Sequence, residues 1–249
     1  EGKKEVQPGF SISTNPEIIR LPDLTDKTKL DVRYPLLPPY AYAHIHWDQE
    51  SNEFIYELDE PSLNGEEKEI LSKIESGLKE LINMSFVNIK SDEAVIDYLE
   101  KNVKVILNEL SIKLTKESFL NIVYYIYRDF VGLNEIEPLL KDYYIEDIEC
   151  NGFKTPIYIV HRKYRNLRTN ISFESNEKLT SFVEKLAQKC GKYVSYATPL
   201  LNGVLSDGTR VNATYTQEIS TRGPTFSLRK FVKIPWTPVK MIDFRTASP

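Results

Sequence analysis

Basic side chains near the end of the chain are the residues whose type and spacing best suit phosphate chemistry. They are Arg210 at the start of RVNATY, Arg222 in the loop STRGP, and Arg229 and Lys230 in TFSLRKF. A guanidinium group offers paired N–H donors and a permanent positive charge to phosphate oxygens. If these segments are antiparallel strands, the side chains can converge on one end of a sheet. The alternative is a basic face that is only solvated.

The loop before Arg210 fits a phosphate-binding P-loop only in part. GVLSDGTR nearly satisfies G-x-x-x-x-G-K-[ST], but Thr209 stands at the lysine position and Arg210 at the magnesium-binding position. Asp207-Gly208 between alternating apolar residues is instead a strong β-hairpin signal. Since no other G-x-x-x-x-G occurs in the sequence, we expect no Walker A motif and no catalytic residue in this chain.

Metal binding and nucleophilic catalysis are weaker hypotheses. His44 and His46 have the i, i+2 spacing that places both imidazoles on one face of a strand, but the only other histidine is His161. Because a zinc site needs three or four ligands, we expect ordinary hairpin histidines and no metal. The carboxylates of Glu146 and Asp147 are expected to be solvated. There is no G-x-S-x-G motif, and neither cysteine has an evident histidine partner.

Positive charge is concentrated in the second half of the chain. The net charge of the 249 residues is −4, yet residues 1–149 carry 16 basic and 30 acidic side chains (−14), and residues 150–249 carry 16 and 6 (+10). This asymmetry predicts that the second half meets an anion, such as a nucleotide, a nucleic acid, an acidic lipid or an acidic partner. The segment HRKYRNLR interleaves basic residues with a tyrosine, a pattern that can bind a nucleic-acid backbone. A charged turn is the simpler interpretation of this segment.

Composition excludes several classes of protein. With 41% apolar and 27% charged residues, the chain is not disordered, collagenous or a disulfide scaffold. Two cysteines without CxxC spacing favour a reducing compartment. No apolar stretch approaches the roughly 18 to 20 residues that span a bilayer. The chain opens without Met and stops at TASP, which suggests a fragment of a longer polypeptide.

The first half is predicted to be an arm followed by a hairpin and helices. Residues 1–39 hold six of the fourteen prolines, so we expect an extended or disordered arm that wraps its own domain or a partner. Residues 40–142 form the next predicted domain. It begins with a hairpin, AYAHIHWDQESNEFIYELDE, and continues with three amphipathic helices that start after Asn64, Ser91 and Thr115, the last ending near Gly132.

The second half is predicted to be an α+β domain over residues 143–234. A short helix in NEIEPLLKD leads to strands in YIEDIEC, TPIYIVH and LRTNISF. A helix then runs from Ser175 to Gly191, followed by a hairpin in PLLNGVLSDGTRVNATYT and a strand in TFSLRKF. We expect one helix on a curved antiparallel sheet. Residues 235–249 are expected to be a linker to an absent domain.

From about residue 130 onward, this order of segments resembles the domain that precedes the motor domain in secretion-superfamily ATPases. These drive type II secretion, type IV pilus assembly and, in archaea, the archaellum. The segments that carry the resemblance are YIEDIECNG, IYIVHRKYRNLRTNISF, PLLNGVLSDGTRVNAT, ISTRGPTFSLRKF and TPVKMID. The archaeal branch is most similar, because DGTRV and FSLRKF occur there in close to this form. The resemblance covers roughly the last 115 residues.

The resemblance implies a homohexameric ring ATPase. A PAS-like N-terminal α+β domain would fold over ATP and Mg²⁺, which a RecA-like C-terminal motor domain mainly holds; that domain and its Walker motifs are absent here. Arg210 and Arg229 match the arginines that reach the nucleotide phosphates, and Arg222 and Lys230 are weaker candidates.

The resemblance also implies a location and a set of partners. The protein would be cytoplasmic and associated peripherally with the inner face of the cell membrane. Its partners would be its own motor domain, neighbouring subunits, a polytopic membrane platform protein and other filament-motor components, with no nucleic acid. The alternative is a free-standing adaptor or ligand-binding module without ATPase activity.

Overall fold

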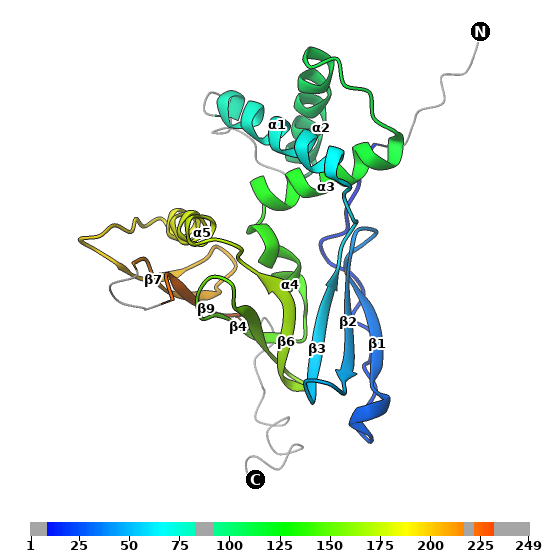
Figure 1. The fold of residues 1–249 in the computed structure, drawn as a ribbon, viewed down its shortest axis with the longest axis vertical. Helices are drawn as coiled ribbons and strands as arrows, with labels where there is room; N and C mark the ends of the chain where they lie inside the picture. Colours follow the sequence, from blue (N-terminus) through cyan, green and yellow to red (C-terminus); the bar gives the residue numbers. More distant parts are fainter. Residues whose placement is uncertain (1–8, 83–91, 217–221, 232–249) are drawn as a thin grey trace. The chain divides into compact units, whose positions relative to one another are not determined.

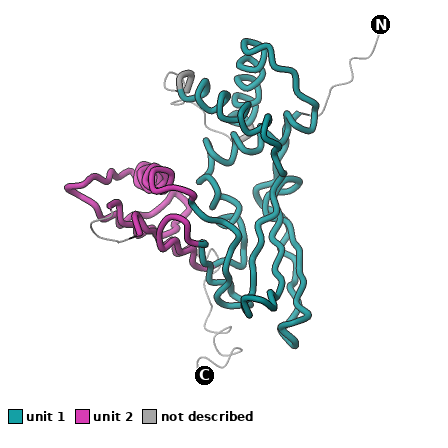
Figure 2. The backbone as a smooth tube through the Cα atoms, viewed as in Figure 1, with its two compact units in different colours: residues 1–145, 156–173 teal, residues 146–155, 174–249 magenta. Residues whose placement is uncertain are grey.

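The computed structural model describes residues 9–82, 92–216 and 222–231. They form two compact units, each assembled from two stretches of chain (Figure 2). Unit 1 lies within residues 1–145 and 156–173, and unit 2 within residues 146–155 and 174–249. The predicted linker over residues 235–249 is outside the described part of the chain.

Unit 1 contains a mixed sheet (Figure 1). Its strands, in spatial order, are β1 (Asp31–Leu37), β2 (Ala41–Asp48), β3 (Glu53–Asp59), β6 (Arg165–Ser172) and β5 (Pro156–His161). Neighbours run antiparallel, except that β3 and β6 are parallel. In β2 the residues Ala41, Ala43 and Ile45 are fully buried, which is the period-two pattern of a half-buried strand. The predicted hairpin is therefore confirmed.

The predicted arm contains a strand that we did not expect. Residues 31–37 form β1 on the edge of the sheet, where Pro35 is tolerated because an edge strand has backbone N–H groups that need no sheet partner. The short 3-10 helix η1 (Lys27–Lys29) precedes it. Earlier arm residues pack on unit 1: the Phe10 ring stacks on Tyr40 at 5.2 Å, and the Tyr164 hydroxyl donates to the Pro22 carbonyl at 2.8 Å. The described part of the arm thus wraps its own unit.

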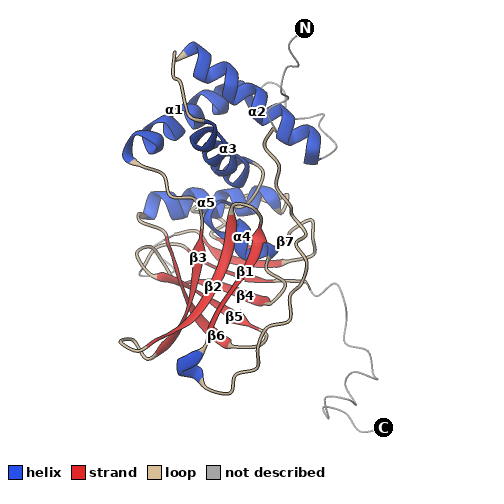
Figure 3. Ribbon diagram, turned by 90° about the vertical axis from the view of Figure 1, so that its right-hand side faces the viewer, coloured by secondary structure: helices blue, strands red, loops and turns tan. Residues whose placement is uncertain are grey.

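The three predicted helices are present as α1 (Gly65–Ile82), α2 (Asp92–Glu109) and α3 (Lys116–Phe130), which group at one end of unit 1 (Figure 3). Asn64 and Glu67 form a reciprocal capping box before α1, with two backbone-to-side-chain bonds of 2.9 Å. The Thr115 hydroxyl accepts the Ser118 N–H at 3.1 Å and caps α3. The apolar stripes meet in a buried core that includes Ile74, Leu78, Leu99, Val103, Ile122 and Ile126.

Unit 2 is a two-layer α+β unit. The strands lie in the order β4 (Ile145–Cys150), β9 (Thr225–Arg229), β8 (Arg210–Thr214) and β7 (Leu200–Val204), all antiparallel. The helix α5 (Asn176–Lys189) begins at the Ser175 cap and ends before Gly191, whose φ is +65°. Its face packs on one side of the sheet, where Phe182 lies 5.1 Å from Phe226 between ring centroids. This agrees with the predicted α+β class, although the predicted sheet also included β5 and β6, which belong to unit 1.

The compact units do not follow the expected boundary between residues 142 and 143. The 3-10 helix η3 (Asn134–Ile136) and the short helix α4 (Glu137–Lys141) match the helix predicted there. However, β6 pairs with β3, so that β5 and β6 belong to unit 1. The Asn170 side chain extends this pairing, because it accepts the Leu58 N–H at 2.9 Å and donates to the Leu58 carbonyl at 3.1 Å.

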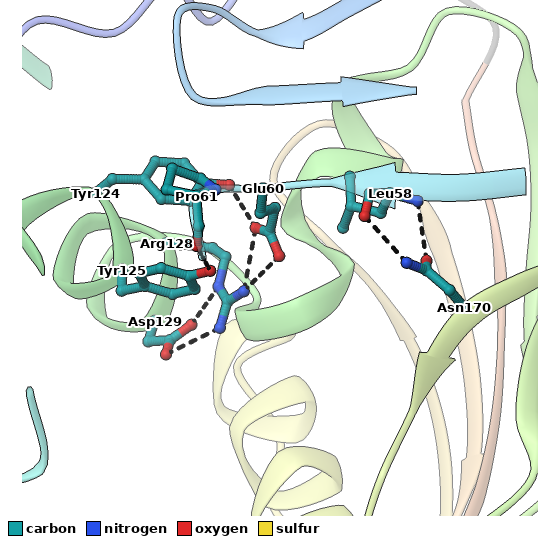
Figure 4. A network of polar contacts seen from close by, with 8 residues as sticks. All are labelled: Leu58, Glu60, Pro61, Tyr124, Tyr125, Arg128, Asp129 and Asn170. Atoms are coloured by element: carbon teal, nitrogen blue, oxygen red, sulfur yellow. Dashed lines mark hydrogen bonds and ion pairs between the residues drawn. The ribbon is translucent and has the colours of Figure 1, made fainter. Parts of the chain in front are cut away.

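A buried ion pair joins the end of β3 to α3 (Figure 4). Arg128 Nη1 lies 2.9 and 3.1 Å from the two Glu60 carboxylate oxygens, and Arg128 Nε lies 2.7 Å from Asp129 Oδ1. The Tyr125 ring covers the guanidinium at 4.6 Å, and its hydroxyl donates to the Pro61 carbonyl at 2.6 Å. Burial alone would lower the pKa of Arg128, but the neighbouring carboxylates raise it above its ordinary value.

No helix in the described ranges is long and apolar enough to cross a membrane.

Replacing Glu60 by Gln should destabilise the protein by about 3 kcal/mol, because the buried charge of Arg128 would keep only one of its two carboxylate partners. The adjacent Asp59→Asn is the matched control, since Asp59 pairs with Arg33 at the exposed surface and should cost less than about 1 kcal/mol. Urea unfolding monitored by circular dichroism gives both values. Equal losses in the two variants would contradict the importance of the buried pair.

Candidate functional site

The structure brings Arg210 and Arg229 together. They are directly opposite on the neighbouring strands β8 and β9, and directly opposite residues of an antiparallel pair project from the same face. That face is the one away from α5, because the residues that alternate with them, Val211 and Leu228, are buried. Both arginines are exposed. The expected convergence is therefore present for this pair.

Lys230 and Arg222 lie at different ends of the last strand. Lys230 is one residue beyond Arg229, and its backbone N–H donates to the Glu146 carbonyl at 2.8 Å. Arg222 lies three residues before the start of β9, and the strand from Thr225 to Arg229 is itself about 13 Å long at roughly 3.3 Å per residue. A phosphate held between Arg210 and Arg229 is therefore out of reach for Arg222.

The loop that contains Arg222 is tied instead to the turn at Gly152. The Phe153 N–H donates to the Arg222 carbonyl at 3.3 Å. Gly152 has φ +122°, and a Cβ there would lie 2.4 Å from the Arg222 carbonyl oxygen. No side chain fits that space, so glycine is required where β4 ends and the two segments meet.

A third residue of the same row, Asp147, was not expected. It lies directly opposite Arg229 on β4, and its carboxylate oxygens lie 2.8 Å from Arg229 Nε and 3.4 Å from Nη2. The Asp147 side chain is only 17% exposed, so the prediction that this carboxylate is solvated is wrong. Hydrogen bonding and charge attraction to Asp147 raise the pKa of Arg229. Strand register, which local sequence does not reveal, creates this contact.

The turn before Arg210 is a hairpin turn, as expected. Asp207 accepts the Thr209 N–H at 2.9 Å and the Thr209 hydroxyl at 3.0 Å, and Gly208 has φ +89°. A strand follows it, so the geometry excludes a P-loop. The turn nevertheless fixes Arg210 as the first residue of β8. Arg210 and Arg229 in this row can thus offer positive charge and N–H donors to an oxyanion, and Asp147 is a competing acceptor for Arg229.

The cysteines do not offer a nucleophile. Both thiols are free. Burial raises the pKa of Cys150 to about 11, which keeps it protonated at neutral pH. Burial likewise raises the pKa of Cys190.

A buried network of titratable groups in unit 1 has no signal in local sequence. Asp142 accepts hydrogen bonds from the hydroxyl groups of Tyr34 at 2.6 Å and Tyr56 at 2.8 Å. His161 Nε2 is 3.5 Å from the Tyr34 oxygen, and its Nδ1 accepts the Tyr164 N–H at 3.1 Å, so Nε2 carries the proton of a neutral ring. All five of these residues are at most 4% exposed. The network is closed to substrates and serves the core.

No protein family model matches the chain. It is similar to three proteins of Methanocaldococcus jannaschii, each described as uncharacterized. Identity is 37% over 66% of this chain and 65% of MJ1288, and 36% over 55% of this chain and 25% of MJ0900. It is 36% over 47% of this chain and 16% of MJ0781. The chain therefore matches less than two thirds of the length of each relative.

Among solved structures, the chain is similar to the VirB11 ATPase of the Brucella suis type IV secretion system in complex with sulphate. The match covers 46% of this chain and 36% of that chain, at 17% identity and a TM-score of 0.36. A TM-score of this size does not establish a common fold.

The buried histidine predicts a pH dependence of stability. Burial, with Arg162 and Lys163 nearby, lowers the pKa of His161 from 6.5 to about 3. Between these values the unfolded chain binds a proton that the folded chain does not. Stability should therefore fall as pH drops below 6.5, with a slope of up to about 1.4 kcal/mol per pH unit from this group.

His161→Asn tests this dependence, because Asn cannot titrate and its carbonyl can still accept a backbone N–H. The variant should be less stable at pH 7 but should lose less stability between pH 7 and pH 5 than the wild type. Urea unfolding across that range measures both curves. Parallel curves would show that His161 does not set the slope.

Proposed function

We propose that the chain is the N-terminal region of a secretion-superfamily ATPase of the archaeal type IV filament class, whose unit 2 presents arginines to nucleotide phosphates. The observation that carries the proposal is the row of Arg210 and Arg229 on one exposed face. These two arginines stand in DGTRV and FSLRKF, the segments that most resemble the family. The fold thus supports the two positions that the resemblance selects first.

The proposed ligand is ATP with Mg²⁺, held mainly by a RecA-like motor domain that follows in the whole protein. Unit 2 has an arginine row but no P-loop at the turn beside it, so it can contact phosphates and cannot enclose them. A G-x-x-x-x-G-K-[ST] motif encoded shortly after Pro249 is the first expectation of the proposal.

In this proposal Arg229 alternates between two partners, Asp147 and a nucleotide phosphate. With no nucleotide, the carboxylate holds the guanidinium along the sheet through two contacts. A γ-phosphate carries more negative charge than one carboxylate and also accepts paired N–H bonds, so it can take Arg229 from Asp147. Hydrolysis and phosphate release would return the arginine to Asp147. The same row would thereby report the state of the nucleotide.

Turnover of the whole ATPase tests this role. Arg210→Ala and Arg229→Ala should each lower kcat at least tenfold, because each removes charge stabilisation from the transferring phosphoryl group. Arg33→Ala is the matched control: Arg33 is likewise an exposed arginine paired with an aspartate, but in unit 1, and turnover should not change. Turnover near that of the wild type in both test variants would remove the proposed role.

We further propose that unit 1 docks the ATPase, as part of a homohexamer, on a polytopic membrane platform protein and other filament-motor components at the inner, cytoplasmic face of the membrane. The arm supplies the contact: its apolar side chains Ile18, Ile19 and Leu24 are 55%, 37% and 44% exposed, although the arm backbone is held on unit 1. Exposed apolar residues on a fixed segment are typical of protein contacts.

The arm can be tested without deleting it, since removal of residues 1–39 would also remove β1. Ile18→Ser with Leu24→Ser should impair filament function in cells while ATPase activity stays within twofold of wild type, because neither residue is buried in unit 1. Leu21→Ser is a contrasting control, since Leu21 is 2% exposed and its loss should lower stability instead. Normal filament function in the double variant would contradict docking through the arm.

A further inference from the structure

Three potential metal ligands lie together on the open face of the strands β2 and β3. His44 and His46 alternate on β2, and Glu57 is directly opposite His44 on β3. Each offers a ligand atom, and these atoms all lie within 4.8 Å of one another. Local sequence showed only the histidine pair; the register of the hairpin adds the carboxylate. We propose that His44, His46 and Glu57 bind one divalent transition-metal ion, for which zinc is the best match.

The contacts of His44 indicate which of its nitrogens faces the metal. Nδ1 lies 3.4 Å from Glu57 Oε2, whereas Nε2 lies 2.8 Å from Asp31 Oδ1 on the other neighbouring strand. With a metal on Nδ1, the Nε2–H group donates to Asp31. A carboxylate that holds the far nitrogen of a metal-bound imidazole is the usual support for such a ligand. Asp31 is therefore a positioning residue in this proposal.

His46 supplies an independent observation. Its Nδ1 atom is buried, and within the described residues it has no hydrogen-bond partner. Buried polar atoms nearly always have a partner, so an unpaired one calls for an explanation. The His46 ring lies 4.8 Å from the His44 ring between centroids, on the same face. A metal shared with His44 and Glu57 would satisfy this nitrogen.

A proton on His44 is the competing explanation. An imidazolium would account for the contacts of His44 with Asp31 and Glu57, but it leaves His46 Nδ1 unpaired. The local charge also favours a cation: Asp31, Glu57 and Asp59 outnumber Arg33, which pairs with Asp59 and lies over the Tyr42 ring. Metal binding therefore explains more of the contacts than protonation does.

The donor set fits zinc in number and type. Two imidazoles and one carboxylate are ligands that zinc accepts at about 2.0 to 2.2 Å, with a fourth position left for water. Around such an ion the ligand atoms are about 3.3 Å apart, so small side-chain rotations close the present spacing. Co²⁺, Ni²⁺ and Cu²⁺ accept the same donors.

Calorimetric titration of the purified 249-residue chain with ZnCl₂ tests the site. We expect one saturable site per chain in the wild type. His46→Ala and Glu57→Gln each remove a ligand and should weaken binding at least tenfold, and Asp31→Asn should weaken it by about 10 to 100-fold. Glu50→Gln, which removes an exposed carboxylate from the turn between the same strands, should bind zinc as the wild type does.

Two further measurements separate lost ligands from lost folding. Saturating zinc should raise the Tm of the wild type and of Glu50→Gln but not that of His46→Ala. Without metal, the circular dichroism spectra of all three proteins should be the same. Co²⁺ should give the visible absorption of a tetrahedral site in the wild type and in Glu50→Gln, but not in His46→Ala. Absence of saturable binding by the wild type, or binding by His46→Ala and Glu57→Gln at wild-type affinity, would overturn the proposal.

Discussion

A guanidinium group that is almost completely shielded from water sits where the helices of unit 1 meet its strands. Glu60 and Asp129 lie against Arg128 and Tyr125 covers it, and these contacts offset the cost of burying its charge. Glu60 follows directly after β3, so this pair fixes the end of the strand that carries Glu57. The desolvation cost of an unpaired charge therefore constrains the helices, the hairpin and the proposed metal site together.

Part of the positive charge of the second half of the sequence is paired with acidic residues of the first half inside unit 1. Basic residues of β6 and of the turn that joins it to β5 contact acidic or aromatic residues of the first half. Lys163 pairs with Asp23 at 2.7 Å, and Arg168 lies 3.3 Å from Glu53. These basic residues therefore join the two halves of the sequence within unit 1. The arginines on the open face of unit 2 are the portion that the proposed function assigns to an external anion.

Much of the fold could be predicted from the sequence. The helix starts at Asn64, Thr115 and Ser175, the hairpin of β2 and β3, and the turn at Asp207-Gly208 were all predicted from residues within a few positions of one another. Their energies are local: a side chain bonds the first turn of its own helix, or a glycine adopts a positive φ. The proximity of Arg210 and Arg229 was one of two possibilities that the sequence left open, because alternation along adjacent strands sets which side chains share a face.

Only the tertiary structure decided which distant segments pair. The sequence determined that residues 31–37 could be extended, that Arg229 carries a charge and that the two hairpin histidines share a face. It did not determine that residues 31–37 form an edge strand, that Asp147 holds Arg229, or that Glu57 and Asp31 flank His44. The physical reason is that strand register and burial between remote segments depend on packing of the whole unit, whereas capping and alternation depend on near neighbours.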